Sequence, residues 1–309
     1  MNPAYSVILF TTASGAGYGL LGLLGLVGFN HGQASSLAFG IASMAIALSL
    51  ITIGLLSSTL HLGHPERAWR ALSQWRSSWL SREGVAAVVT YIPAVIFGIV
   101  WSGLIAAPAL VAPLGLITAA MCAISVLCTG QIYACLKTIR AWAQPLTTPA
   151  YLAFSLATGG TLLTAVASCF GRFQKFQAIF AIAALLLVGV VKIFYWRAID
   201  AAPRDRTIEA ATGLGRIGAV SQWELPHTAT NFVQKEMGFA VARKHAAKLR
   251  MFVLAALAAA LTLMLASLAV PLVSIVATLA ALAAAVVERW LFFAEARHVS
   301  MLYYGDKAL

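Results

Sequence analysis

The chain runs without a charged residue through Ser36-Leu-Ala-Phe-Gly-Ile-Ala-Ser-Met-Ala-Ile-Ala-Leu-Ser-Leu-Ile-Thr-Ile-Gly-Leu-Leu-Ser-Ser-Thr-Leu60 and then enters His61-Leu-Gly-His64-Pro-Glu-Arg67. About 20 mostly apolar residues in an α-helix are enough to cross the hydrocarbon core of a bilayer. Residues 1–65 contain no Lys, Arg, Asp or Glu, and neither do residues 84–136. The stretch therefore predicts a transmembrane helix that ends at the polar edge of the membrane, beside His61.

The composition of the whole chain supports the same class. Hydrophobic residues make up 61% of the 309 residues, charged residues only 10%, and the mean hydropathy is +0.87. These values exclude a soluble globular protein of this length. Because the apolar runs are continuous and do not alternate, they predict helices and exclude a β-barrel. We therefore expect an all-α, polytopic integral membrane protein with eight transmembrane helices.

The apolar runs define a single membrane domain over residues 1–309. The eight spans are expected near residues 4–28, 36–60, 84–107, 113–136, 149–170, 176–196, 251–270 and 272–293. The N-terminus has no basic region and no cleavage site around its apolar stretch. We therefore assign it to the first helix and not to a signal peptide.

The basic residues predict the orientation. Most of the 21 Lys and Arg residues fall in the loops and tail on one side of the expected membrane domain. By the positive-inside rule this side is cytoplasmic, so both termini and the His61 loop are expected in the cytoplasm, with the spans in a bacterial inner membrane. The formal net charge of +11 fits attraction to anionic lipid and does not require nucleic acid.

One glycine motif in the first span points to packing. Gly17-Tyr-Gly19-Leu-Leu-Gly22 matches the dinucleotide-binding pattern GxGxxG, but no strand precedes it and no βαβ unit surrounds it. The small residues instead predict a helix face that a neighbouring helix approaches closely. They are Gly15, Gly19, Gly22 and Gly25.

The sequence predicts no metal centre in this chain. Four cysteines fall within the expected spans without CxxC spacing, so neither an iron–sulfur cluster nor a zinc site is expected. They are Cys122, Cys128, Cys135 and Cys169. A haem would need axial histidines paired on facing helices, whereas the histidines fall in loops, at the surface or at span ends. Haem is therefore not expected either.

Residues 231–250 end the long connection before the seventh span and show an amphipathic pattern. Phe232 and Met237 can face the lipid boundary, while Arg243 and Lys244 can face water or phosphate. Two roles stay open for this expected surface helix: a membrane-surface anchor and a docking platform for a soluble partner.

The stretch from His61 to Glu83 concentrates ionisable groups at the edge of a span. The imidazole of His61 should lie at the hydrocarbon boundary, where it can exchange a proton near neutral pH. Four arginines between residues 67 and 82 accompany only two acidic residues, so an oxygen-rich headgroup would find several donors. The pattern favours a functional site over a polar loop whose arginines only fix the topology.

Glu288 and Arg289 place two charges inside the last span. A charge near mid-membrane costs about 2.5–3.5 kcal/mol on the insertion scale, so both side chains should face the bundle interior or a polar cavity. Neighbouring residues diverge by about 100° around a helix. We therefore expect each of the two to have a different partner.

Two motifs resemble those of a known family. Ser58-Thr-Leu-His61-Leu-Gly63-x-Pro65-x-Arg67-Ala68, followed by Leu80-Ser81-x-Glu83, resembles the signature of the membrane anchor subunits of dimethyl sulfoxide reductase-type molybdoenzymes, the DmsC-like family. Arg289-x-x-Phe292 is similar to that family's last helix, and residues 235–245 resemble a longer-looped branch. One position departs from the pattern, because Gly84 stands where a larger apolar residue is common.

The resemblance implies a subunit that carries the quinol site but no catalytic centre and no haem or cluster of its own. Such a subunit binds a membrane quinol, menaquinol or ubiquinol, and oxidises it in anaerobic respiration. It passes the electrons to an iron–sulfur subunit with 4Fe-4S clusters, which relays them to a molybdopterin catalytic subunit. These two subunits and membrane lipid are the expected partners.

The resemblance also suggests roles for single residues. The family's histidine that matches His61 is associated with quinol binding, so His61 is the expected proton acceptor. Gly63 and Pro65 would shape the turn, Arg67 would orient a headgroup oxygen, and Glu83 would be the proton outlet. The positions expected to bind quinol are His61, Gly63, Pro65, Arg67, Ser81, Arg289 and Phe292. The basic residues expected to dock the partners are Arg70, Arg76, Arg243 and Lys244.

Two other functions stay open. The same anchor would reduce quinone if electrons flowed in reverse, as in sulfite-oxidising relatives, because the direction depends on the catalytic partner's potential. A secondary anion transporter would need internal repeats and charged or broken helices near the midplane, and the sequence shows neither a clear repeat nor a midplane charge cluster.

Overall fold

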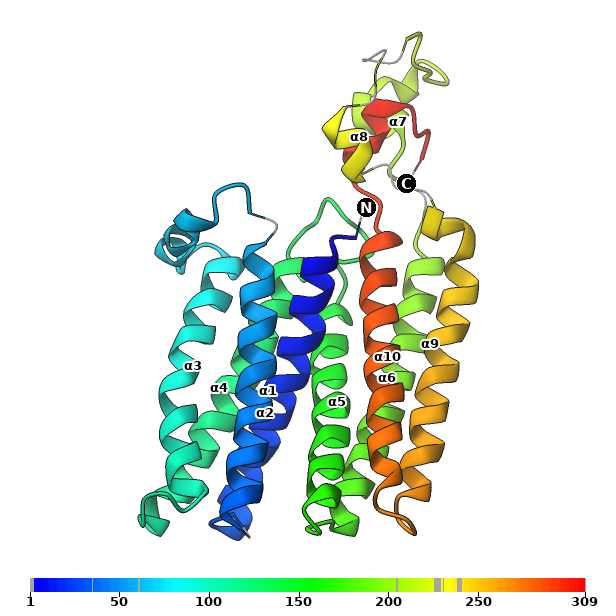
Figure 1. Cartoon of the computed structure of the whole chain (residues 1–309). Helices are drawn as coiled ribbons and strands as arrows, with labels where there is room; N and C mark the ends of the chain where they lie inside the picture. The colour runs from blue at the N-terminus through cyan, green and yellow to red at the C-terminus, as the bar shows by residue number, and fades with distance from the viewer. Residues whose placement is uncertain are drawn as a thin grey trace.

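A computed structural model describes residues 3–34, 36–60, 62–203, 205–224, 229, 231–237 and 241–308; for 232, 236 and 241–244 it describes only the backbone. Within this part of the chain, eight helices are long and apolar enough to cross a membrane (Figure 1). They are α1 Tyr5–His31, α2 Leu37–Thr59, α3 Trp79–Trp101, α4 Pro108–Ala134, α5 Thr147–Cys169, α6 Lys175–Asp200, α9 Val241–Ala266 and α10 Val273–Ala294. The predicted all-α class and the eight spans are confirmed.

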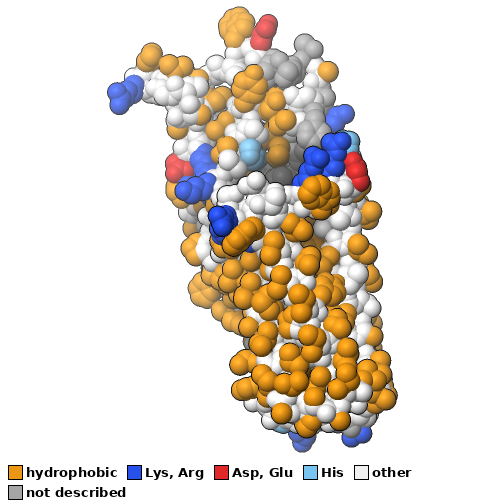
Figure 2. Space-filling model, turned by 90° about the vertical axis from the view of Figure 1, so that its left-hand side faces the viewer, with side chains coloured by type: hydrophobic (Ala, Val, Ile, Leu, Met, Phe, Trp, Pro, Cys, Tyr) orange, Lys and Arg blue, Asp and Glu red, His pale blue; other side chains and the backbone are white. Residues whose placement is uncertain are grey.

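Short helices occupy the connections on the side of the bundle where both termini lie (Figure 1). They are η1 Pro65–Gln74, α7 Ile208–Thr212, η2 Leu214–Arg216, α8 Phe232–Met237 and η3 Val299–Tyr304. Figure 2 shows an apolar surface over most of the length of the long helices, with Lys and Arg gathered above it and a few below. This is the surface of a protein embedded in lipid.

The expected surface helix over residues 231–250 takes a different form. The short helix α8 ends at Met237, and the long helix α9 begins at Val241 and continues into the span. Ala246 and Leu249 pack against the core of the bundle. Their spacing is in phase with the buried positions deeper in α9, so the segment extends the span instead of lying flat beside it.

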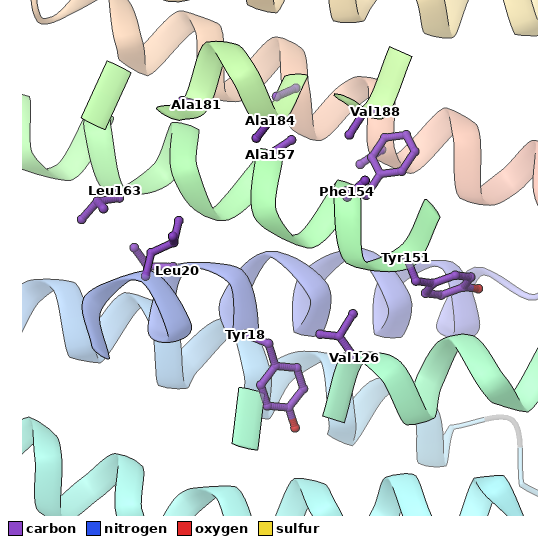
Figure 3. Packing of buried hydrophobic residues seen from close by; sticks show 14 of the residues in the cluster. Tyr18, Leu20, Val126, Tyr151, Phe154, Ala157, Leu163, Ala181, Ala184 and Val188 are labelled. Carbon is purple, nitrogen blue, oxygen red and sulfur yellow. The ribbon is translucent and has the colours of Figure 1, made fainter. Parts of the chain in front are cut away.

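The long helices form two groups of four. In the first group α1 packs on α2 and α4, and α3 packs on α4. In the second group α5 packs on α6 and α10, and α9 packs on α10 and α6. The groups meet where α1 and α4 pack on α5 (Figure 1). Figure 3 shows this layer from close by, with Ala157 of α5 beside Ala184 of α6.

Glycine makes the contact between the two groups possible. A Cβ atom on Gly19 would overlap the carbonyl of Ser155, and one on Gly159 would overlap the backbone of Gly19. The Oγ of Ser155 donates to the Gly15 carbonyl over 2.7 Å, which ties α5 to α1. The close helix approach predicted for the first span is therefore confirmed at Gly19.

The remaining glycines of that face behave differently from one another. Gly25 meets Gly115 of α4 backbone to backbone, so it also fulfils the prediction. A Cβ on Gly22 would make an ordinary contact with Cys122, and one on Gly15 would meet nothing within 4 Å. Close approach thus depends on two of the four predicted glycines.

Candidate functional site

The predicted headgroup site begins at η1, which connects α2 to α3. His61 lies outside the described residues. Gly63 is exposed, and a Cβ atom there would meet nothing within 4 Å. Pro65 is the first residue of η1, a position that suits proline because its ring fixes φ and its nitrogen needs no partner.

The helix η1 lies directly on the start of α3. The buried Ser81 donates its hydroxyl to the Ala71 carbonyl of η1. A Cβ atom on Gly84 would come within 2.8 Å of Leu72 Cδ2. The small residue at position 84, for which the sequence offered no reason, is therefore explained by the close approach of η1.

Glu83 lies beneath this cover, about one turn into α3. Its side chain is only 6% exposed, and among the described residues its Oε1 atom has no hydrogen-bond partner. A carboxyl group buried without a partner is unusual, because an unpaired buried charge is costly. Its place next to the end of α2 makes it a candidate carrier for a proton.

The arginines of this region divide into two kinds. Arg82 packs 4.3 Å from the ring centroid of Trp79 and donates to the backbone carbonyls of Trp75 and Arg76, so it fixes the end of η1. The other three are exposed. Arg67, Arg70 and Arg76 lie on the outer surface of the segment, where they are accessible to a ligand or a partner.

Arg289 lies in the other group of helices, in a buried cluster of three charges. Glu288 Oε1 is 2.6 Å from Lys192 Nζ, and Glu288 Oε2 is 2.6 Å from Arg289 Nε. No side chain of the three is more than 4% exposed. The expectation that Glu288 and Arg289 have separate partners is wrong, because the long arginine side chain bridges the angle between them.

The sequence analysis did not anticipate this charge cluster. Lys192, on α6, was the signal that could have revealed it, since it is the only charged residue in the sixth expected span. A lysine that remains inside an apolar span needs an acidic partner on a facing helix. Glu288 on α10 is that partner.

Aromatic rings enclose the cluster. The Arg289 guanidinium lies 3.8 Å from the ring centroid of Tyr151, and Lys192 Nζ lies 3.7 Å from that of Tyr195. Phe292 stacks on Trp142 with centroids 5.3 Å apart, and the Trp142 indole donates to the Phe292 carbonyl. The rings provide cation–π contacts and exclude lipid from the charges.

Beside Arg289 lies a cavity of about 20 Å³ between α1, α4, α5 and α10. Such a volume holds one or two water molecules and is far smaller than a quinone ring. In the described part of the chain, Arg289 Nη1 and Nη2 and the Tyr151 hydroxyl have no hydrogen-bond partner. The structure thus brings Ser81 and Glu83 together under η1 and places Arg289 and Phe292 in the other helix group.

Comparison with known proteins identifies the architecture. The profile described as DMSO reductase anchor subunit (DmsC) matches residues 1–295. The chain belongs to the DMSO reductase anchor subunit family. It is also 31% identical over 332 aligned positions to the C-type subunit of the sulfite dehydrogenase from Allochromatium vinosum, with both chains covered completely. No solved structure matches the chain.

Family membership makes this anchor subunit an integral membrane protein that associates with the catalytic subunits of a molybdoenzyme. Of the residues expected to dock them, Arg70 and Arg76 are exposed on η1. Arg243 and Lys244 lie in the first turn of α9, and their side chains are outside the described part. Within the described residues, no three His, Cys, Asp or Glu side chains are grouped so as to hold a metal ion.

Proposed function

We propose that this anchor subunit binds a membrane quinol, menaquinol or ubiquinol, where α2 and α3 meet the headgroups, and oxidises it. One observation carries the proposal: Glu83 is buried under η1 with an unpartnered carboxyl oxygen, one turn from the start of α3. A quinol has a polar head and an apolar tail, so a site at the boundary between hydrocarbon and headgroups matches both parts.

The chemistry requires two protons and two electrons to leave the quinol. In this proposal His61 accepts a proton from one phenol group, and Glu83 carries protons away from the headgroup. Arg67, exposed near the start of η1, orients a headgroup oxygen by donating hydrogen bonds. Ser81, Gly63 and Pro65 hold the shape of the turn.

The electrons pass to an iron–sulfur subunit with 4Fe-4S clusters, which relays them to a molybdopterin catalytic subunit. We place the docking of these partners on the face that carries η1. Exposed Arg70 and Arg76 would meet acidic side chains there, next to exposed Trp69 and Trp75. By the charge bias of the loops, this face and both termini are assigned to the cytoplasm, with the spans in a bacterial inner membrane.

A second candidate keeps the site and reverses the electron flow. The relative in Allochromatium vinosum belongs to a sulfite dehydrogenase, and oxidation of a substrate by the catalytic partner would deliver electrons to quinone. His61 and Glu83 would then supply protons instead of removing them.

The two directions and the site itself can be tested in membranes that contain the complete complex. His61→Arg should abolish binding of a quinol analogue, and Glu83→Gln should slow electron transfer by about 100-fold, the usual contribution of a proton-transfer group. Glu66→Gln is the matched control, because Glu66 lies exposed on η1. Normal quinol-linked electron transfer in both site variants would refute the proposal, and the preferred direction follows from comparing quinol oxidation with quinone reduction.

A further inference from the structure

A groove of about 840 Å³ lies where α6, α9 and α10 end, on the side of the bundle that holds both termini (Figure 1). Its walls come from the loop 140–145, the end of α6 with residues 198–203, the first part of α9, and the segment after α10. A hydrogen bond from Val299 N to the Thr138 carbonyl, 3.2 Å long, holds that last segment against the loop. Pockets that bind small molecules have volumes of about 300–1,000 Å³.

The walls of the groove carry more positive than negative charge. Four guanidinium groups line it, and they belong to Arg140, Arg206, Arg250 and Arg297. The carboxylates nearby are already paired. Asp205 is 2.8 Å from Arg140, while Asp200 and Glu295 are 2.6 Å and 2.9 Å from Arg250. The hydrogen bond from Arg140 lowers the pKa of Asp205, so this pair stays charged at neutral pH.

Two arginines remain without an acidic partner in the described part of the chain. Arg206 donates only to the carbonyl of Lys137, over 2.9 Å, and Arg297 is exposed. A neutral molecule would leave both charges uncompensated. Planar guanidinium groups bind phosphate through paired hydrogen bonds, which makes a phosphate the matching ligand group.

The groove also leads to the lipid-facing surface. Ala198 lines the groove, and Phe194 lies one helical turn deeper on the same face of α6. Val190 and Leu187 continue this stripe, and the three apolar side chains are 55%, 50% and 47% exposed, from Phe194 downwards. A ligand in the groove can therefore extend an apolar chain along α6 into the membrane.

We propose that this groove binds an anionic phospholipid, with the phosphate between Arg206 and Arg297 and an acyl chain along Phe194, Val190 and Leu187. The surplus positive charge selects an anionic headgroup over a zwitterionic one and over the uncharged head of a quinol. The apolar stripe selects a lipid over an acidic segment of a partner subunit. Anchor and catalytic subunits would thus meet beside a bound lipid.

The test uses the full chain purified from membranes and reconstituted into nanodiscs of phosphatidylcholine with or without phosphatidylglycerol. Wild type should retain phosphatidylglycerol selectively in mass spectrometry and unfold at a higher temperature in its presence. At about 1 kcal/mol for each arginine near a surface, Arg206→Gln combined with Arg297→Gln should weaken binding by about 30-fold. Arg172→Gln, on the exposed loop between α5 and α6, is the matched control.

Three results would overturn the proposal. The first is equal retention of phosphatidylglycerol by wild type and the double variant. The second is equal stabilisation by inorganic phosphate, which would assign the groove to a soluble anion. The third is loss of the lipid from wild type when the complete complex assembles, together with cross-linking of a partner subunit at position 297. That result would assign the groove to a protein contact.

Discussion

Among the described residues, the helices α1 to α4 bury one charged side chain, Glu83, whereas α5, α6, α9 and α10 bury Lys192, Glu288 and Arg289. The two groups are similar in apolar surface and in helix number, yet their interiors differ. In the second group every charge has an opposite charge within 2.6 Å and an aromatic enclosure. In the first group the single carboxyl has an oxygen without a partner.

The difference separates two uses of charge inside a membrane. A closed set of ion pairs fixes how helices pack, because moving any helix would break a pair in a medium of low polarity. A lone carboxyl contributes nothing of this kind and remains available to exchange a proton. The comparison therefore assigns a structural role to the Glu288 cluster and a chemical role to Glu83.

Glu288→Gln is the largest expected break of this comparison. It removes the only acid between Lys192 and Arg289 and leaves two positive charges buried together. Breaking a buried ion pair in this way costs about 3–5 kcal/mol. Thermal unfolding of the purified chain in detergent measures the loss. A variant in which Met replaces all three charged residues is the control, and it should be much more stable than the single variant.

The junction between the two groups gives the next effect. Gly19→Ala places a methyl group against the Ser155 carbonyl, and overpacking of a close contact costs about 1–3 kcal/mol. Gly15→Ala is the matched control in the same helix, because its Cβ would meet nothing within 4 Å. Ala is favoured over Gly within a helix by about 1 kcal/mol, so the control should be neutral or stabilising. Equal unfolding temperatures for the two variants would contradict close contact at this junction.

The contrast between Gly19 and Gly15 also shows what a sequence can predict. Uncharged runs long enough to span a bilayer determine the helix number, because lipid tolerates no other backbone arrangement, and the spans follow from them. The glycine face was predictable as a contact surface. Which glycines touch backbone depends on where two helices cross, and nothing local encodes that.

The buried charges show the same limit. Glu288 and Arg289 were visible as charges in a span, but their pairing with Lys192 joins α10 to α6, which lie far apart in the sequence. Adjacent residues on a helix were expected to diverge, and the flexibility of the arginine side chain overrode that geometry. Glu83 was predicted from its motif, whereas its cover by Leu72 and Ser81 depends on how η1 folds back.

The cover itself is the basis of a smaller prediction. Gly84→Ala should push Leu72 aside, because a Cβ would lie 2.8 Å from its Cδ2. The end of a leucine side chain can move, so the cost should stay near 1 kcal/mol or below. We expect weaker binding of a quinol analogue, measured by titration in membranes. Adding Leu72→Ala should restore binding if the contact is the cause, and a double-mutant cycle measures the coupling.

The smallest expected change in stability sharpens the comparison most. Glu83→Gln keeps the shape of the side chain and breaks no ion pair, since the carboxyl oxygen has no partner. The amide faces the same desolvation as the neutral acid, so the free energy of unfolding should change by less than about 1 kcal/mol. The same substitution at Glu288 should cost several times more. Unfolding curves for the two variants, recorded in one detergent, make the test direct. If Glu83→Gln destabilised the chain as much as Glu288→Gln, both carboxyls would be structural, and the proton-carrying role of the first would lose its physical basis.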